Sequence, residues 1–293
     1  MDIYCHAVLE HPLKFTVEEF RAWKNKKVTL LGMSGVGKTH LSTMLRDNHW
    51  FHFSGDYRIG TRYLDEPILD MIKEQAMQVP FLHDLLRNDW IYIRNNIKVH
   101  DLGPVLSFVG KLGNPDLGGV ELDDFIKRQA QYRDAEIATM NDVPDFIEKA
   151  QNIYGYQHFV NDMGGSLCEL EESSVIDSLV ENTLMLYIKV TNKEEESKLI
   201  ARAQSAPKPL YYRPEFLQQQ LADYLKENNL EYAAEMVPDE FTRWVFPRLF
   251  HARIPRYEEI AKKGYTVTSE EVAKVKNEKD FLKLLETSIS REN

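Results

Sequence analysis

The chain of 293 residues is 43% hydrophobic and 11% aromatic, which provides enough apolar side chain for a packed core and excludes wholesale disorder. Its formal net charge of −10 argues against a general binder of nucleic acid or anionic membranes. The two cysteines, Cys5 and Cys168, lack the spacing of metal ligands, so we expect neither a disulfide scaffold nor a zinc site. The N-terminus has no basic-plus-apolar leader and no apolar run approaches roughly 18 residues, which predicts a cytoplasmic protein without a membrane partner.

The first part of the chain predicts a helix, a strand and a second helix in succession. The pattern Thr16-Val17-Glu18-Glu19 is that of a capping box, which predicts a short helix to about Asn25. Residues 27–31 have the apolar character of a short buried strand, and residues 39–47 place apolar side chains at helical spacing. A glycine-rich segment separates this strand from the second helix.

That segment has the pattern G-x-x-x-x-G-K-[ST], the P-loop, whose backbone N–H groups bind the phosphates of a nucleoside triphosphate. The motif consists of Gly32, Met33, Ser34, Gly35, Val36, Gly37, Lys38 and Thr39, and we add the following residue, His40, to the predicted phosphate site. Lys38 is expected to contact the β- and γ-phosphates, and the Thr39 hydroxyl is expected to ligate Mg²⁺. The motif therefore predicts ATP and Mg²⁺ as cofactors, although it binds the phosphates of the nucleotide and does not distinguish ATP from GTP.

A second strand is predicted at residues 50–53, and a long helical region follows it. From 64 to 154 the pattern is largely helical, with an amphipathic helix over 123–140 and another from about Pro144 to Gly155. We assign no structure to residues 90–99.

Alternation of strands and helices resumes after this region. Strands are predicted at 157–161, 184–190 and 265–267. Helices are predicted at 193–204, at 215–228, at 239–263 with breaks at Pro247 and Pro255, and after an N-cap at Asn277. This alternation predicts an α/β fold, a three-layer P-loop NTPase core with a mainly parallel five-stranded sheet. The core comprises residues 1–63 and 155–293, and residues 64–154 form a large helical insertion.

Two carboxylates follow predicted strands, where ligands bind in open parallel sheets. Asp56 follows the second strand and is a candidate for polarising an acceptor hydroxyl, with a helix cap as the alternative. Asp162 follows the third strand and is a candidate for holding Mg²⁺, directly or through water. Gly164 and Gly165 come next, and glycines permit close approach of the backbone to a substrate.

The segment 193–213 combines cations with prolines, as expected of a mobile lid over the triphosphate. Arg202 and Arg213 are candidates for stabilising charge on the transferring phosphoryl group. The alternative is a solvated helix whose Glu and Lys side chains pair with each other.

Taken together, these residues resemble the branch of P-loop proteins that contains nucleoside-monophosphate kinases and shikimate kinases. Asp56 followed by Ile59 is similar to the acceptor-binding Asp-x-x-Ile of shikimate kinases. Gly164-Gly165 matches part of their glycine run at the acceptor pocket, and Arg202 falls where their lid arginine lies. The resemblance implies a kinase fold, ATP with Mg²⁺, and a small-molecule acceptor.

The chain also departs from the shikimate kinase pattern. Ser54 stands where these kinases have a first Asp, the glycine run is interrupted, and the 64–154 insertion is far longer than theirs. Such kinases insert their acceptor-binding subdomain at this place. The chain as a whole also resembles a group of uncharacterised bacterial proteins described only as predicted ATPases.

The insertion and the residues after Asp56 are therefore the places to look for acceptor contacts. Arg58, Arg62, Arg128 and Arg133 are candidate clamps for an anionic acceptor such as a carboxylate or phosphate. The alternative is that they are solvated surface charges, since acidic residues share the same predicted helix.

We interpret the sequence as that of an ATP-dependent phosphotransferase acting on a small molecule, with Lys38, Asp56, Arg202 and Arg213 as its catalytic residues. One alternative is an ATPase switch that hydrolyses ATP and binds a protein partner through the insertion. A second is a kinase-like toxin acting on a nucleotide-sugar. The sequence names neither the acceptor nor the oligomeric state.

Overall fold

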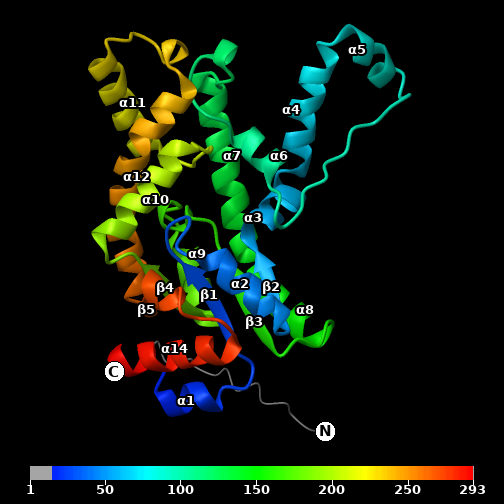
Figure 1. Cartoon of the computed structure of the whole chain (residues 1–293). Helices are drawn as coiled ribbons and strands as arrows, with labels where there is room; N and C mark the ends of the chain where they lie inside the picture. The colour runs from blue at the N-terminus through cyan, green and yellow to red at the C-terminus, as the bar shows by residue number, and fades with distance from the viewer. Residues whose placement is uncertain (1–14, 293) are drawn as a thin grey trace.

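The computed structural model describes residues 15–292 (Figure 1). Cys5 and most of the N-terminal segment considered above lie outside this range. The five strands of the sheet are β1 (Lys27–Leu31), β2 (Trp50–Ser54), β3 (His158–Asp162), β4 (Leu184–Lys189) and β5 (Tyr265–Thr268). All four pairings between them are parallel, in the order β2-β3-β1-β4-β5.

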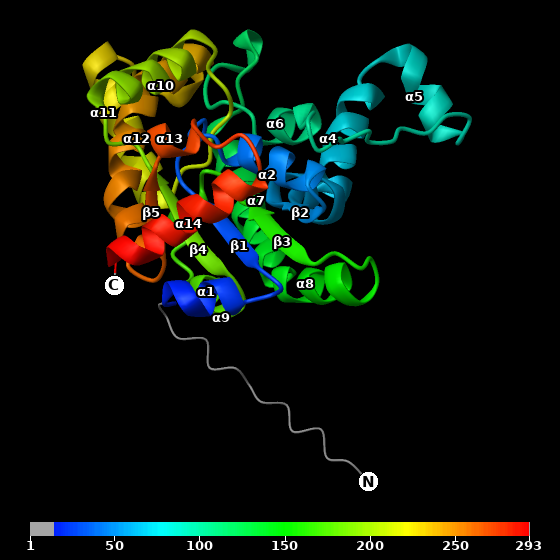
Figure 2. The ribbon, with the colours of Figure 1, turned by 60° about the horizontal axis from the view of Figure 1, so that its bottom comes forward.

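Helices cover both faces of this sheet and extend well beyond it. The α-helices are α1 (Val17–Ala22), α2 (Lys38–Asp47), α3 (Gly55–Arg58), α4 (Asp65–Met77), α5 (Pro80–Arg87), α6 (Gly103–Val109), α7 (Leu122–Asn141), α8 (Val143–Asn152), α9 (Ser173–Asn182), α10 (Lys193–Ser205), α11 (Pro214–Asn228), α12 (Pro238–Ala261), α13 (Ser269–Val272) and α14 (Glu278–Glu292). Helices α2 and α14 lie on one face and α8 and α9 on the other (Figure 2). The predicted α/β P-loop fold with a parallel five-stranded sheet is confirmed.

The strands are nearly continuous apolar runs because helices bury both of their faces. In β1, Val28, Leu30 and Leu31 are almost fully buried, and β4 is equally apolar. β1 lies in the centre between β3 and β4, so the loop that leaves its carboxyl end lies at the middle of the sheet edge. Open α/β sheets bind ligands at this position.

Local signals placed the ends of several helices correctly. The capping box at Thr16 and Glu19 forms as predicted, with each side chain bonded to the other residue's backbone N–H. Asn277 caps the last helix, because its Oδ1 accepts a hydrogen bond of 3.0 Å from the Asp280 N–H. Residues 90–99, left unassigned, contain no regular helix or strand.

The predicted breaks at Pro247 and Pro255 were wrong. α12 runs without interruption from Pro238 to Ala261 and contains both prolines. A proline removes one N–H donor and crowds the preceding turn, which bends a helix but does not end it when packing holds both sides. Buried side chains before, between and after the prolines, such as Val245, Leu249 and Tyr257, supply that packing.

Two smaller clusters of buried side chains lie above the sheet. One joins Leu112 and Phe125 to buried residues of α11 and α12, such as Phe216 and Phe241. The other is enclosed by α4, α6, α7 and the segment that follows β2, and Phe108 is among its members. The 64–154 region therefore packs against helices that come much later in the chain.

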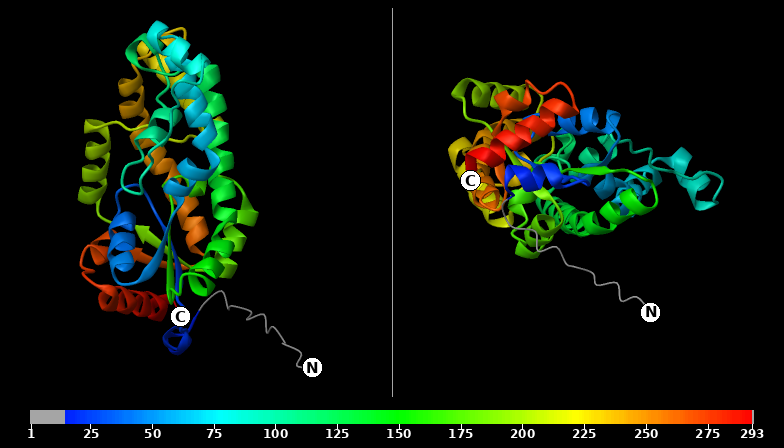
Figure 3. Two further views of the ribbon diagram at one scale, coloured as in Figure 1. Left: turned by 90° about the vertical axis from the view of Figure 1, so that its right-hand side faces the viewer. Right: turned by 90° about the horizontal axis from the view of Figure 1, so that it is seen from below.

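Helices α4 and α5 form an arm that projects from the body in Figure 1 and in the right-hand view of Figure 3. α5 has no buried residue, and three aromatic side chains near it are widely exposed: Phe81 (76%), Trp90 (71%) and Tyr92 (79%). Among residues 15–292, no helix has the length and apolar character needed to span a bilayer.

Candidate functional site

The P-loop joins β1 to α2 through backbone conformations that only glycine adopts easily. Gly32, Gly35 and Gly37 have φ angles of 138°, 91° and 105°, in the left-handed half of backbone space. At Gly32, an added Cβ would lie 2.7 Å from the Ile188 carbonyl oxygen, so the loop also passes close to β4. The loop thus leads directly into the N-terminus of α2, where free N–H groups and the helix dipole favour phosphate.

The Lys38 ammonium group lies buried inside this loop. Its Nζ donates hydrogen bonds to the carbonyl oxygens of Gly32 (2.6 Å) and Met33 (3.0 Å). Burial lowers the pKa of Lys38, whereas the nearby carboxylates of Asp162 and Asp56 oppose that shift. The cation is therefore held at the place where a P-loop lysine meets phosphate oxygens.

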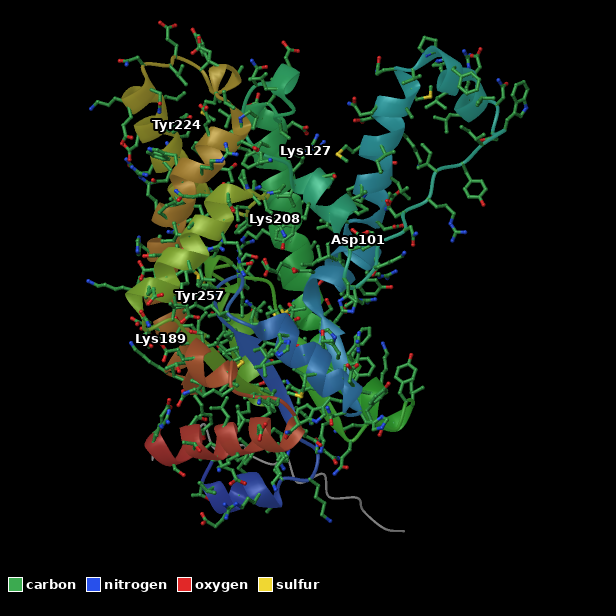
Figure 4. The ribbon with its side chains drawn as sticks, viewed as in Figure 1. Asp101, Lys127, Lys189, Lys208, Tyr224 and Tyr257 are labelled. Carbon is green, nitrogen blue, oxygen red and sulfur yellow. The ribbon has the colours of Figure 1, made fainter. Side chains whose placement is uncertain are left out.

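A cavity of about 630 Å³ opens beside the loop and brings most of the predicted site together. Its walls include the P-loop and helix-start residues Ser34, Gly35, Gly37, Lys38, Thr39 and His40, and, from the ends of β2 and β3, Asp56, Asp162, Gly164 and Gly165. The insertion contributes residues 99–103 and Leu106, and Lys208 comes from the segment after α10. Asp101 and Lys208 are labelled in Figure 4. The side chains of Met33 and Val36 are buried in the core instead, so these two residues contribute only their backbone to the phosphate loop.

Asp56 lies two residues after Ser54, whose side chain caps α3. Asp56 is half-buried as a residue, but its Oδ1 is buried and has no hydrogen-bond partner among the described residues. Burial raises the pKa of Asp56 to about 6, the Asp162 charge adds to this rise, and Lys38 opposes it. A carboxylate with this pKa beside a phosphate site is suited to accepting a proton from a hydroxyl group.

Asp162 ends β3, next to β1 in the sheet, and is 8% exposed. Its Oδ2 lies 3.6 Å from Nε2 of His52, a β2 residue that sequence reasoning missed. Because Thr39 and Asp162 line the same cavity, they are placed to share an ion bound with phosphates. Among residues 15–292, no group of three or more His, Cys, Asp or Glu side chains is arranged to hold a metal by itself.

The two glycines after β3 lie close to the P-loop. An added Cβ at Gly165 would lie 3.2 Å from the Ser34 backbone nitrogen and 3.8 Å from the Arg253 guanidinium. The Tyr257 hydroxyl is within hydrogen-bond distance of the Gly165 (2.8 Å) and Gly32 (3.1 Å) carbonyl oxygens. Tyr257, on α12 (Figure 4), thus fixes the glycine turn against the phosphate loop.

Two charged residues of this region were not predicted as functional. Glu136 on α7 is fully buried, although the sequence analysis did not single it out from the other acidic residues of that helix. Burial raises the pKa of Glu136 to about 7, and the hydrogen bond from Ser166 Oγ (2.7 Å) opposes this rise. Arg253 on α12 is 6% exposed and donates to Glu169 and to the Tyr211 carbonyl oxygen. For both Glu136 and Arg253, the sequence feature that could have indicated a role was a charged residue at a helical position that faces the core.

Four arginines predicted to bind the acceptor lie outside the cavity, and we withdraw that assignment. Arg58 pairs with Asp142 at 2.8 Å and stacks on Phe146. Arg62 is exposed on the π-helical turn that follows α3. Arg128 pairs with Asp124 one turn earlier, and Arg133 donates to the Leu170 carbonyl oxygen. Partners that are distant in sequence hold Arg58 and Arg133, and helix periodicity alone does not reveal such partners.

The two predicted lid arginines have different environments. Arg213 forms ion pairs with the fully buried Glu169 (2.7 Å) and with Glu171 (3.2 Å), so we reassign it to a structural role. The Arg202 guanidinium lies against the P-loop, because a side chain added at Gly35 would collide with it. Within residues 15–292, no hydrogen bond or ion pair holds that guanidinium.

No model of a known protein family matches the chain, and no curated protein matches it. Among solved structures, a shikimate kinase from Bacteroides thetaiotaomicron is similar at 13% identity and a TM-score of 0.36, over 91% of this chain and 96% of that one. A likeness at this score carries no argument about the site. The P-loop α/β architecture rests instead on the parallel sheet and on the position of the loop after its central strand β1.

Proposed function

We propose that the protein is a phosphotransferase that uses ATP and Mg²⁺ to phosphorylate a hydroxyl group of a small molecule. The supporting observation is that the Asp56 carboxylate lines the same cavity as the P-loop residues Lys38 and Thr39. A phosphate site alone would serve a switch ATPase equally well. A carboxylate with a raised pKa beside it has the proton affinity needed to act on an acceptor hydroxyl.

Each residue has a distinct part in this proposal. When bound, ATP supplies the phosphoryl group and Mg²⁺ neutralises charge on its oxygens. Lys38 and the loop N–H groups bind phosphate oxygens, and Thr39 and Asp162 hold the metal ion. Asp56 accepts the proton of the acceptor hydroxyl as the new O–P bond forms and ADP leaves. Arg202, placed at Gly35, stabilises the charge that develops during transfer.

The substitution Asp56→Asn tests this proposal. Acceptors are first found by a thermal-unfolding screen of a metabolite library in the presence of Mg²⁺ and an ATP analogue, and then confirmed by ADP release. The ratio of acceptor-stimulated to acceptor-free ADP release should fall to about one in Asp56→Asn, because the amide cannot take the proton. The exposed Asp116→Asn is the matched control and should keep the wild-type ratio. An undiminished ratio in Asp56→Asn overturns the kinase assignment.

One observation favours the second candidate, an ATPase switch with a protein partner. Phe81 on α5 and Trp90 and Tyr92 in the segment after it are widely exposed, and exposed aromatic side chains are enriched at protein-binding surfaces. In this case no small molecule would raise ADP release, and Asp56→Asn would lower acceptor-free hydrolysis or leave it unchanged.

A further inference from the structure

The chain that follows α5 has the geometry of a β-strand but has no neighbouring strand. It returns from the tip of the arm toward α6 as an extended trace (Figure 1). Within residues 15–292, no hydrogen bond joins the backbone of residues 91–97 to another part of the backbone. Side-chain exposure alternates there, because Tyr92, Arg94 and Asn96 are exposed and the residues between them are less so. Such alternation is typical of extended backbone with one face toward solvent.

The residue types at the start of this extended chain are those favoured in strands. Four consecutive residues are aromatic or β-branched: Trp90, Ile91, Tyr92 and Ile93. The other end is fixed to the base of the arm, because the Asn95 side-chain amide donates to the Asp65 carboxylate (2.9 Å) and carbonyl oxygen (3.1 Å). An exposed apolar strand edge with unpaired backbone groups is a template for pairing with another chain. We call residues 90–94 the arm segment.

The arm segment is complementary to itself in the antiparallel direction. If two copies pair about a twofold axis at Tyr92, residue 90 lies opposite residue 94, and residue 91 lies opposite residue 93. Trp90 then meets Arg94 of the second copy on one face of the ribbon, and Ile91 meets Ile93 of the second copy on the other face. A cation on an aromatic ring and a pair of β-branched side chains are both stabilising contacts across strands.

Arg94 supports a charged partner of this kind. Its side chain is exposed, and it has no ion pair or hydrogen bond within residues 15–292. Trp90 is 71% exposed, so its ring is also open to a cation from another molecule. A second copy thus supplies both groups at once, which a partner of unrelated sequence does not do by symmetry.

We propose that the arm segment pairs with the arm segment of a second copy, so that the protein forms a symmetric dimer through an antiparallel β-ribbon. The pairing satisfies backbone groups of both segments and covers Trp90 and Tyr92. The arm projects from the body in the right-hand view of Figure 3, which leaves the segment open to a second copy. The inference does not depend on the proposed phosphotransferase function, because no residue of the arm segment lines the P-loop cavity.

Sedimentation equilibrium of the full chain over a wide range of concentrations tests the dimer. The wild type should form dimers that dissociate on dilution. Tyr92→Asp places like charges opposite each other at the axis, so it should raise the dimer dissociation constant by at least about tenfold. Ile153→Asp is the matched control and should keep the wild-type constant, since Ile153 is also widely exposed (69%) but lies at the end of α8. Circular dichroism checks the fold of each variant.

A pair of charge variants tests the register of the ribbon. Tyr92→Asp and Tyr92→Lys should each be monomeric when studied separately, because like charges meet at the axis. An equimolar mixture of the two should recover the dimer, because opposite charges then meet there. Recovery of this kind requires that the two copies of residue 92 lie opposite each other.

A wild type that stays monomeric at every concentration overturns the proposal, and the arm segment is then covered by a different protein or by none. An unchanged dissociation constant in Tyr92→Asp overturns it as well. If both charge variants are monomeric and their mixture does not recover the dimer, pairing about Tyr92 is refuted. None of these outcomes bears on the phosphotransferase proposal, which is tested by ADP release.

Discussion

At the scale of single residues, the buried Lys38 ammonium is the charge on which phosphate binding depends. It is held by two P-loop carbonyl oxygens and is positioned to exchange them for phosphate oxygens. We expect Lys38→Ala to lose turnover and to weaken the binding of Mg²⁺-ATP, with circular dichroism unchanged. Calorimetry measures the affinity, and the exposed Lys198→Ala is the control. Wild-type affinity and turnover in Lys38→Ala would refute the nucleotide site.

Glu136 gives a second prediction at this scale, which concerns stability and pH. Its pKa rises from 4.5 to about 7 on folding, so the folded state holds the proton more tightly than the unfolded chain. The contribution of Glu136 to the free energy of unfolding is therefore complete below pH 4.5 and is lost as the pH rises through 7. The full difference between the two pKa values corresponds to about 3 kcal/mol.

The substitution Glu136→Gln removes this titration while keeping the side-chain shape. Relative to wild type, the ligand-free variant should become more stable as the pH rises from 5 to 8, by on the order of 2 kcal/mol. Urea unfolding at the two pH values measures the difference. Glu148→Gln, at an exposed position of α8, should show no such pH-dependent difference. If the free energy of unfolding changes equally with pH in Glu136→Gln and in wild type, the raised pKa of Glu136 is contradicted.

At the scale of elements, α10 and the segment after it present two arginines with opposite expected behaviour. Arg213 neutralises the fully buried Glu169, so Arg213→Ala should lower the free energy of unfolding by about 2 kcal/mol or more. Arg202 lies at Gly35 with no ion pair in the described range, so Arg202→Ala should leave stability unchanged but lower turnover by ~10³-fold. Urea unfolding and ADP release on both variants measure the two effects. The reverse pattern would show that Arg213 is the lid arginine.

At the scale of the whole molecule, stability should be uneven between the sheet and the arm. β1 and β4 are almost fully buried, whereas α5 has no buried residue. Local opening costs little free energy where few apolar side chains are buried. In native-state hydrogen exchange, amides of α5 should exchange orders of magnitude faster than those of β1. Equal protection of α5 in the free protein would show that another surface covers the arm in solution.

The sequence alone determined the nucleotide loop, the strands and the parallel α/β architecture. These depend on neighbours in the chain: the glycines of the P-loop, the apolar runs of β1 and β4, and the capping pairs at Thr16 and Asn277 all act over a few residues. For the same reason the sequence placed Asp56, Asp162 and Gly164 correctly at the strand ends, since parallel strands end at one edge.

Tertiary structure decided which charges belong to the site. Glu136 and Arg253 come from helices far from the P-loop in sequence, and their burial depends on how α7 and α12 pack. Arg128 and Arg133 share the helix of Glu136, yet they face other partners. Pro255 lies within a continuous helix because packing offsets the hydrogen bond that it removes. The sequence around a charged residue looks the same whether the residue lies on a solvated face or is buried. Only contacts between distant segments distinguish the two cases.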